Sequence, residues 1–300
     1  MRINQAIASE RTTRIYPMLS VVPDLSQVSE LSNEDTKEVL AFLNVRPVHT
    51  VVMTSFILDN GIESTLNRGK YFGYRNDEGR LEGVALIGHS TLVEARTEVA
   101  LEAQAYAART SDTAIHLIMS GGDVATAFWN YLFGPSVEPS TTCTELLFEM
   151  GFPFPVQGCD HDVRYATAEE LEAVAEAQAE VAELECGVNP LLRDREGFLK
   201  RVSRRIEQQR VFVVFEGDEL VFKADVIART DSVAYLEGVY VSPRFRGQGV
   251  GSKCLSDVCV RLLSEVSNVC LLSNTAFKGA HRSFVKAGMH NTDACTTLFV

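Results

Sequence analysis

Basic residues are scarce in this 300-residue chain: 28 lysines and arginines stand against 40 aspartates and glutamates, a formal charge of −12 at pH 7. Nucleic acids and anionic membranes attract clustered lysine and arginine, so this balance argues against either partner. The sequence also has no apolar run long enough to span a bilayer, and its first residues contain neither an apolar stretch nor a cleavage site. We therefore expect a cytoplasmic protein that acts on a neutral or cationic substrate.

Paired cysteine motifs are missing as well. The seven cysteines include no CxxC pair and no paired histidine spacing, which argues against a disulfide framework and against a structural metal. Hydrophobic residues, in contrast, make up 46% of the chain and charged residues 23%, a composition typical of globular proteins with a large core. A length of 300 residues predicts about two domains.

The two halves of the chain share one order of expected elements: two helices, an antiparallel meander, then helix, strand, helix and strand. Capping-box pairs begin the first helix of each half, at Ser32 and Asp35 and at Thr167 and Glu170. Between the halves, residues 151–162 contain two prolines and two glycines and favour a loop.

This order predicts an α/β protein with a mixed α+β sheet, built as a tandem of one fold. We expect an N-terminal extension and two domains, at residues 1–30, 31–152 and 160–300.

A glycine-rich turn, residues 241–252, lies between an apolar strand and an amphipathic helix in the second half. Gly247, Gly249 and Gly251 let the backbone approach a ligand closely, and the helix start presents free amides and a positive dipole end. Such a turn can hold phosphate oxygens, with Arg246 either adding charge or bracing the loop. The alternative is a purely structural turn. A nucleoside triphosphate is disfavoured because GxxxxGK[ST] is absent, and a dinucleotide because Ser252 replaces the third glycine of GxGxxG.

Arg246, Gly249 and Gly251 fit the pattern Q/R-x-x-G-x-G/A, and here the sequence resembles the pyrophosphate loop of the GNAT acyltransferase superfamily. The resemblance covers roughly residues 160–300, because VYVSPRFRGQGVG and HRSFVKAGM look like that family's central strand and last helix. Over the full length, FLNVRPVHTVV, LVFKADV and TTLFV are similar to a two-lobed bacterial GNAT group with a poorly characterised N-terminal lobe.

The resemblance implies an acyl-CoA N-acyltransferase fold, acetyl-CoA as co-substrate and no metal. It also implies acetyl transfer to a primary amine of a small molecule or a protein lysine, by direct attack in a ternary complex. The residues expected to contact the cofactor lie on the central strand, the glycine-rich turn and the next strand: Val239, Val241, Arg246, Gly247, Gln248, Gly249, Val250, Gly251, Ser252 and Asn274.

Glu237 is the candidate general base, because a carboxylate within an apolar strand can have its pKa raised by desolvation. On a regular strand it shares a face with Tyr235, Val239 and Val241. The alternative is a structural ion pair between Glu237 and an arginine of the preceding helix, Arg204 or Arg205.

The family's usual proton-donating tyrosine corresponds to Phe284 here, and an asparagine seven residues before it corresponds to Phe277. Phenylalanine has no proton to give, so the expected donor is water or one of three side chains, Tyr240 foremost, with Ser283 and His281. These departures leave two functions open: an N-acetyltransferase, or a catalytically weak acyl-CoA-binding sensor or regulator.

The N-terminal lobe has no equivalent of the glycine-rich turn. We expect its strand-to-helix turn at Gly121, Gly122 and Asp123 to place a carboxylate where the phosphate would lie, so that this lobe binds no CoA. The sequence is compatible with a homodimer.

Overall fold

The computed structural model describes residues 27–153 and 158–300. Most of the expected N-terminal extension and part of the join between the halves lie outside the described residues. Residues Val28–Glu30, which the sequence analysis assigned to the extension, form strand β1 at one edge of the sheet.

The first half of the chain continues with the helices and strands expected from the sequence and with one further strand, β4. In chain order they are α1 (Thr36–Leu43), α2 (Val51–Asn60), β2 (Gly69–Arg75), β3 (Leu81–Gly88), β4 (Ser90–Ala95), α3 (Glu98–Thr110), β5 (Leu117–Gly121), α4 (Val124–Phe133) and β6 (Thr141–Met150).

The second half repeats this order. Its elements are β7 (Arg164–Tyr165), α5 (Leu171–Cys186), α6 (Pro190–Arg193), α7 (Arg195–Glu207), β8 (Val211–Glu216), β9 (Glu219–Arg229), β10 (Val233–Val241), α8 (Val250–Leu263), β11 (Asn268–Asn274), α9 (Lys278–Ala287) and β12 (His290–Phe299).

Both predicted capping boxes are present. The Asp35 carboxylate accepts from the Ser32 backbone N–H at 2.8 Å, and the Glu170 carboxylate accepts from the Thr167 backbone N–H at 2.8 Å. Besides β1, a second strand was missed: β4 follows β3 after the single residue His89 and pairs antiparallel with it. The reversal lies at Gly88 and His89, so the sequence did contain a glycine at this point, and the turn was overlooked.

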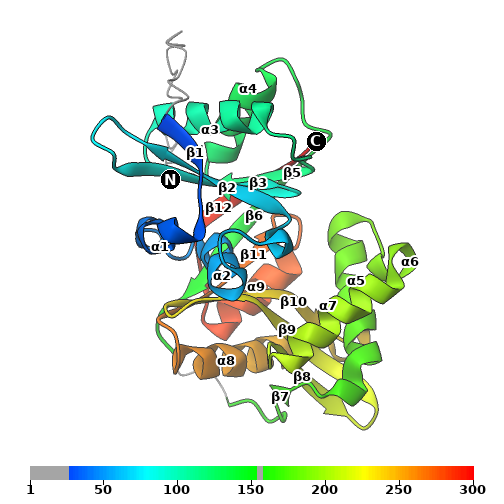
Figure 1. The fold of residues 1–300 in the computed structure, drawn as a ribbon. Coiled ribbons are helices and arrows are strands. Elements are labelled where there is room, and N and C mark those ends of the chain that lie inside the picture. Colours follow the sequence, from blue (N-terminus) through cyan, green and yellow to red (C-terminus); the bar gives the residue numbers. More distant parts are fainter. Residues whose placement is uncertain (1–26, 154–157) are drawn as a thin grey trace, which may run out of the picture.

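The strands of the described residues join in one twelve-stranded sheet, in the order β1-β2-β3-β4-β5-β12-β6-β11-β10-β9-β8-β7 (Figure 1). The last strand of the chain, β12, lies between two strands of the first half, β5 and β6. Strand β6 in turn lies between β12 and β11 of the second half. The two lobes therefore exchange their final strands, and neither lobe has a complete sheet without the other.

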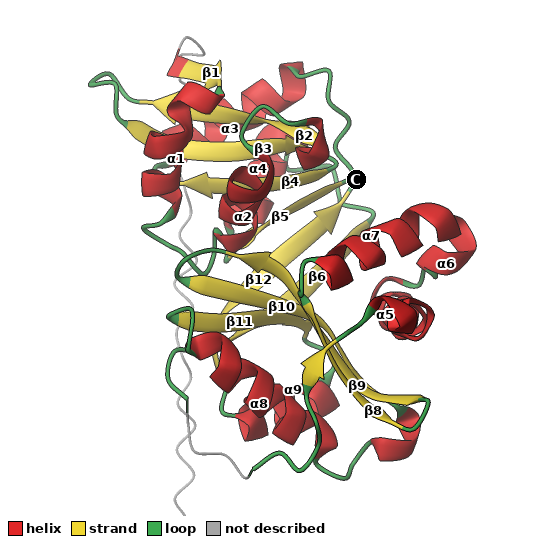
Figure 2. Ribbon diagram, turned by 60° about the horizontal axis from the view of Figure 1, so that its bottom comes forward, coloured by secondary structure: helices red, strands yellow, loops and turns green. Residues whose placement is uncertain are grey.

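Helices cover both faces of the sheet in each lobe (Figure 2). In the N-terminal lobe, α1 and α2 bury one apolar cluster, and α3 and α4 bury another on the opposite face. In the C-terminal lobe, α8 and α9 pack on one face, and α5 and α7 pack on the other.

Helix α2 also connects the lobes. Val51 of α2 packs with Tyr235 and Cys270 of the C-terminal sheet in a small apolar cluster. Arg210, the residue before β8, donates two hydrogen bonds, of 2.9 and 3.0 Å, to the Asp59 carboxylate of α2. The N-terminal lobe thus covers part of the sheet face on which Tyr235 lies.

Candidate functional site

The predicted glycine-rich turn connects β10 to α8. After β10, residues Pro243–Phe245 form one turn of 3-10 helix, and the chain then passes through Gly247 and Gly249 with φ of +77° and +84°. Side chains rarely tolerate such φ values, and a β-carbon at either glycine would meet no atom within 4 Å, so the backbone rather than crowding requires glycine here. No side chain caps the start of α8. Its first amides are therefore free to bind an anion.

Gly251 is required for a different reason. A β-carbon at this position would lie 2.9 Å from Cγ2 of Val241, the last residue of β10. Val250 beside it is buried in the core under α8, which fixes the helix start against the strand. The Ser252 hydroxyl donates to the Gly249 carbonyl at 2.9 Å, so it stabilises the first turn of α8 rather than blocking its amides.

Arg246 braces this turn. Its Nε donates to the Val241 carbonyl at 2.9 Å and its guanidinium pairs with Glu180 of α5 at 3.0 Å. The guanidinium also lies over the ring of Tyr240, 5.9 Å from its centre. Gln248 closes the turn by donating to the Arg244 carbonyl at 2.8 Å. The bracing role that the sequence left open for Arg246 is thus present, and its charge still lies beside the glycines.

Strands β10 and β11 part next to this turn. Their parallel pairing runs from Val233 with Asn268 to Leu236 with Leu271 and ends there. Beyond Leu236, no strand of the described residues pairs with the backbone edge of β10 that faced β11. Such an edge can bind the amide-containing arm of a ligand.

A bulge interrupts β10 just after the two strands part. The register with β9 goes from Glu237 with Asp225 to Tyr240 with Lys223, so β10 has one extra residue, and Gly238 has a φ of +58°. An extra residue reverses the alternation of side chains along a strand. The expectation that Glu237 shares a face with Val239 and Val241 is therefore wrong.

The side chains divide as follows. Tyr235, Glu237 and Tyr240 lie on the face covered by α5 and α2, as shown by the Tyr235–Glu237 hydrogen bond and by the packing of Tyr240 with the α5 and α7 cluster. Val239 and Val241 pack with the α8 cluster on the opposite face.

Glu237 lies among other carboxylates. It accepts a hydrogen bond of 3.1 Å from the Tyr235 hydroxyl, and it keeps access to solvent although protein surrounds it. Burial raises the pKa of Glu237, while the charge of Arg205 and the Tyr235 hydrogen bond oppose this shift. The alternative of an ion pair with Arg205 does not describe this contact, because that guanidinium donates to Asp225 at 2.8 Å.

The charge of Glu237 acts on two further glutamates, which the sequence analysis did not single out. Burial and the charge of Glu237 raise the pKa of Glu145 on β6. Surrounding protein and the charges of Glu237 and Glu145 raise the pKa of Glu185, near the end of α5, to about 7, although this residue keeps contact with solvent. We call Glu145, Glu185 and Glu237 the glutamate cluster. Its members are 40 or more residues apart in the chain, so no spacing motif could have revealed it.

The remaining predicted residues lie around this cluster. Asn274, at the end of β11, donates to the Cys143 sulfur at 3.0 Å and to no other described acceptor. Its carbonyl is 3.0 Å from His281 Nε2. Burial raises the pKa of Tyr240, and the charge of Glu180 adds to the shift, so this phenol stays protonated at neutral pH.

Phe284, where the resemblance would place a tyrosine, is buried and packs edge-on against Phe148 with their ring centres 5.4 Å apart. Phe277 caps the start of α9 without a side-chain hydrogen bond. Neither residue offers a donor at these positions.

In the N-terminal lobe, side chains occupy the positions that correspond to the uncapped helix start and to the gap between the parted strands. The sequence analysis compared the turn at Gly121–Asp123 with the glycine-rich turn of the second half, and this comparison was wrong because β4 had been missed. The glycine-rich turn follows the fourth strand of its lobe, and the turn after the fourth strand of the N-terminal lobe is residues 96–97, between β4 and α3. There the Thr97 hydroxyl accepts from the Ala100 amide at 3.2 Å and occupies the helix start. Where β4 and β5 part, the Ser120 hydroxyl donates to the Val93 carbonyl at 2.9 Å and bridges the gap.

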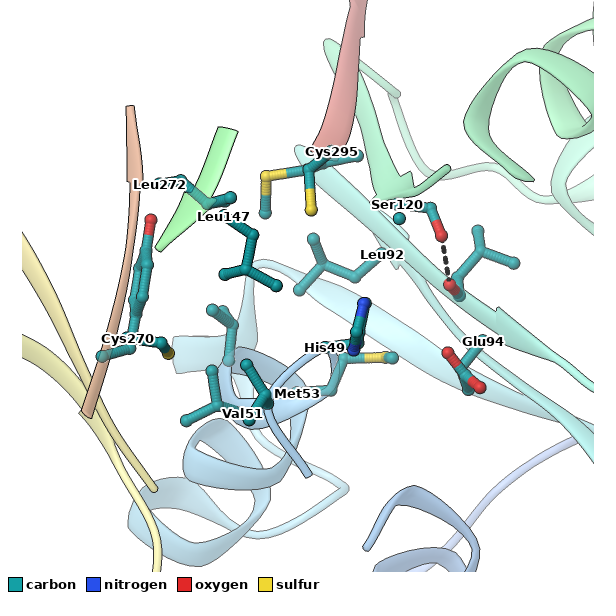
Figure 3. Close-up of a pocket in the computed structure, with 16 residues that line it drawn as sticks. His49, Val51, Met53, Leu92, Glu94, Ser120, Leu147, Cys270, Leu272 and Cys295 are labelled. Carbon is teal, nitrogen blue, oxygen red and sulfur yellow. Dashed lines mark hydrogen bonds between the residues drawn. The ribbon is translucent and has the colours of Figure 1, made fainter. Parts of the chain in front are cut away.

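A pocket lies between the lobes, and Ser120 and Tyr235 are among the residues that line it (Figure 3). It has about 560 Å³ of empty space, open mouth included, and its lining residues come mainly from α2, β4, β5, β6, β10, β11 and β12. Its walls are mainly apolar. The polar exceptions include Glu94, which pairs with Arg46 at 3.2 Å, and His49, which pairs with Asp293 at 2.8 Å. Tyr235 lines the pocket and bonds to Glu237, so the pocket borders the glutamate cluster.

In the described part of the chain, no group of three or more histidine, cysteine, aspartate or glutamate side chains is placed to hold a metal ion. No described helix is long and apolar enough to cross a bilayer.

Residues 171–288 match the model of the acetyltransferase (GNAT) family. No curated protein sequence matches the chain significantly. Among solved structures, a GNAT-family acetyltransferase from Colwellia psychrerythraea superposes with a TM-score of 0.58 at 14% identity and covers 91% of this chain and 99% of its own. A tandem GNAT protein of the clavulanic acid biosynthesis pathway gives 0.56 at 13%, with coverages of 91% and 98%.

A Drosophila protein gives a TM-score of 0.64 at 11% identity, with coverages of 91% and 98%. At these identities the likeness concerns the fold. The expected tandem of GNAT-like α/β lobes is confirmed.

Proposed function

We propose, from the premise that residues 171–288 form a domain of the GNAT acetyltransferase family, that this protein transfers an acetyl group from acetyl-CoA to a primary amine. The observation that carries the proposal is the uncapped start of α8 directly beside the parted strands β10 and β11. The helix start offers a site for the diphosphate, and the unpaired edge of β10 next to it offers a site for the pantetheine arm. The substrate amine belongs to a small molecule or a protein lysine.

In this proposal the cofactor binds only the C-terminal lobe, residues 160–300. The amides of Gly249, Val250 and Gly251 bind the diphosphate, because helix-start amides are unpaired and carry a partial positive charge. Arg246, Gly247, Gln248 and Ser252 hold the loop in shape. Val239, Val241 and Asn274 border the pantetheine arm along the parted strands. The N-terminal lobe, residues 31–152, binds no CoA because Thr97 and Ser120 occupy the corresponding positions.

Glu237 serves as the general base. An amine attacks a thioester only when neutral, so a group beside the acceptor must take its proton. The raised pKa of Glu237 makes this carboxylate a stronger base, which favours proton transfer from the amine. The negative charge of the glutamate cluster attracts a protonated amine. Once the amine nitrogen bonds to the carbonyl carbon, the carbon–sulfur bond breaks and CoA leaves as thiolate. The protonated Tyr240 hydroxyl is the donor we assign to that thiolate.

The assay measures release of CoA thiol from acetyl-CoA with a panel of primary amines. Glu237→Gln should lower kcat by about 10²-fold or more and remove the acidic limb of the pH–rate profile, since a general base contributes roughly 10²–10⁴-fold. Glu216→Gln is the matched control, because this glutamate is half-exposed at the far end of β8. If Glu237→Gln left both kcat and the acidic limb unchanged, the assignment of the base would be wrong.

A second function is favoured by the phenylalanine at position 284. With an apolar ring packed in the core there, the chain lacks the family's usual acid and could bind acyl-CoA as a sensor with little turnover. Acetyl-CoA binding by calorimetry, without thiol release across the amine panel, would select this function. Within the proposal we place the protein in the cytoplasm, and gel filtration decides whether it forms a homodimer.

A further inference from the structure

A lysine is completely buried in the middle of the C-terminal sheet. Lys223 of β9 has no solvent-exposed side-chain surface, and its ammonium donates to three acceptors. These are Asp225 Oδ1 at 2.6 Å, Gln178 Oε1 of α5 at 2.7 Å and the carbonyl oxygen of Gly238 at 3.1 Å. An ammonium has three protons, so every donor of this buried group is used.

The third acceptor belongs to the bulge of β10. Gly238 has a φ of +58°, and a β-carbon there would lie 2.2 Å from Gln178 Oε1 and 2.8 Å from Lys223 Nζ. The bulge therefore fits only glycine, and it fits because the lysine and the glutamine close over it. Asp225 balances the lysine charge and is itself held by Arg205 at 2.8 Å. The whole arrangement fixes one backbone carbonyl.

Fixing that carbonyl also fixes the next amide. In a trans peptide the C=O of one residue and the N–H of the following residue point in opposite directions, and the described residues contain no cis peptide. With the Gly238 carbonyl turned toward Lys223 on the β9 and α5 side, the Val239 N–H points the other way. That direction leads to the edge of β10 that β11 left at Leu236.

We propose that Lys223 is a positioning residue: by holding the Gly238 carbonyl, it directs the Val239 N–H at the carbonyl oxygen of the bound thioester. This inference rests on the proposed acetyl-CoA site. In acyl transfer that oxygen gains negative charge as the amine attacks, and a donor already aimed at it needs no reorganisation. Lys223 touches neither the thioester nor the acceptor; it acts through the peptide unit.

The variants remove the hydrogen bonds that hold the Gly238 carbonyl and keep side chains of similar size. Lys223→Met keeps the length of the side chain without the ammonium, and Asp225→Asn is combined with it so that no buried carboxylate loses its partner. Gln178→Met is a milder variant, because it removes one acceptor of the lysine and leaves the lysine itself in place. Lys200→Met, at an exposed position of α7, is the control.

Three measurements separate positioning from folding: calorimetric binding of CoA, the isotope-edited infrared stretch of the acetyl carbonyl in bound ¹³C-acetyl-CoA, and kcat and KM in the thiol-release assay. We expect CoA affinity and KM within about threefold of wild type, and kcat lowered by about 10- to 100-fold, below the full effect of losing an oxyanion donor. The carbonyl stretch should move toward its value in free acetyl-CoA. Gln178→Met should move it part of the way, and Lys200→Met should not move it.

Two results would overturn the inference. One is an unchanged carbonyl stretch in folded Lys223→Met/Asp225→Asn, or in Gln178→Met if the double variant does not fold. The other is a loss of CoA affinity as large as the loss of kcat, which would make the lysine a purely structural residue. If the wild-type protein binds no CoA, the proposed function fails first, and that outcome is distinct from both.

Discussion

Gly249 offers a direct test of the diphosphate site, because its role depends on backbone shape alone. Its φ of +84° precedes the uncapped start of α8, and nothing lies within 4 Å of the position of a β-carbon. Valine cannot adopt this φ without strain of about 1–3 kcal/mol. Gly249→Val should therefore turn the loop and move the amides that follow, while the rest of the fold remains intact.

The expected loss of CoA affinity follows from the number of backbone amides that would no longer bind the diphosphate. A hydrogen bond to a charged group contributes about 1.5–3 kcal/mol. Losing two such bonds to a diphosphate should cost roughly 3–6 kcal/mol, which weakens CoA binding by about 10²- to 10⁴-fold. Calorimetric titration with CoA measures this change, and thermal unfolding measures the strain as a Tm lower by roughly 4 °C.

Gly217 provides the matched control. It lies in the turn between β8 and β9 with a φ of +59°, and a β-carbon there also meets nothing within 4 Å. Gly217→Val should lower Tm by a similar amount and leave CoA binding unchanged. If both variants bound CoA as tightly as wild type, the anion site at α8 would be refuted.

Two further predictions test the glutamate cluster and the exchanged strands. Glu237→Gln removes a negative charge that raises the pKa of Glu185, so the pKa of Glu185 should fall from about 7 toward 4.5 in an NMR titration of its carboxyl carbon. Because folding raises the pKa of Glu185 from 4.5 to about 7, its contribution to the free energy of unfolding should fall as pH rises between these values, and the variant should flatten that slope in urea titrations. Thr297→Pro in β12 removes an N–H from a strand that pairs with both β5 and β6, and should destabilise the protein by about 3 kcal/mol. Hydrogen exchange should then show β3 and β9 losing protection together, whereas loss in one lobe alone would contradict a shared sheet.

The parts of the site that depend on neighbouring residues could be predicted from the sequence. The alternating glycines at 247, 249 and 251 and the two capping boxes are local patterns, and the structure places them as expected. A bulge has no such pattern. Gly238 resembles any strand glycine, yet its backbone reverses the faces of Val239 and Val241. The alternation rule fails at such a point because one extra residue shifts every later side chain.

Long-range pairing was equally hidden. The apolar segment that ends the chain predicts a strand but not its neighbours, and β12 pairs with strands of the first half. The glutamate cluster depends on this pairing and on the packing of α5, because Glu145 comes from β6 and Glu185 from α5. Sequence reasoning selected Glu237 from its local setting and did not select the two glutamates whose pKa its charge raises.

The exchanged strands give the N-terminal lobe a role although its own turn and strand gap are closed. Strand β6 of the first half supplies Glu145 and pairs with β11 along the length of that strand. Helix α2 covers the sheet face that bears Tyr235, and Tyr235 holds the Glu237 carboxylate. A C-terminal lobe without its partner would lose a sheet strand, one of the three glutamates and the packing behind the proposed base. If the proposed function holds, one active site therefore depends on both lobes, although the proposed diphosphate site lies in the C-terminal lobe alone.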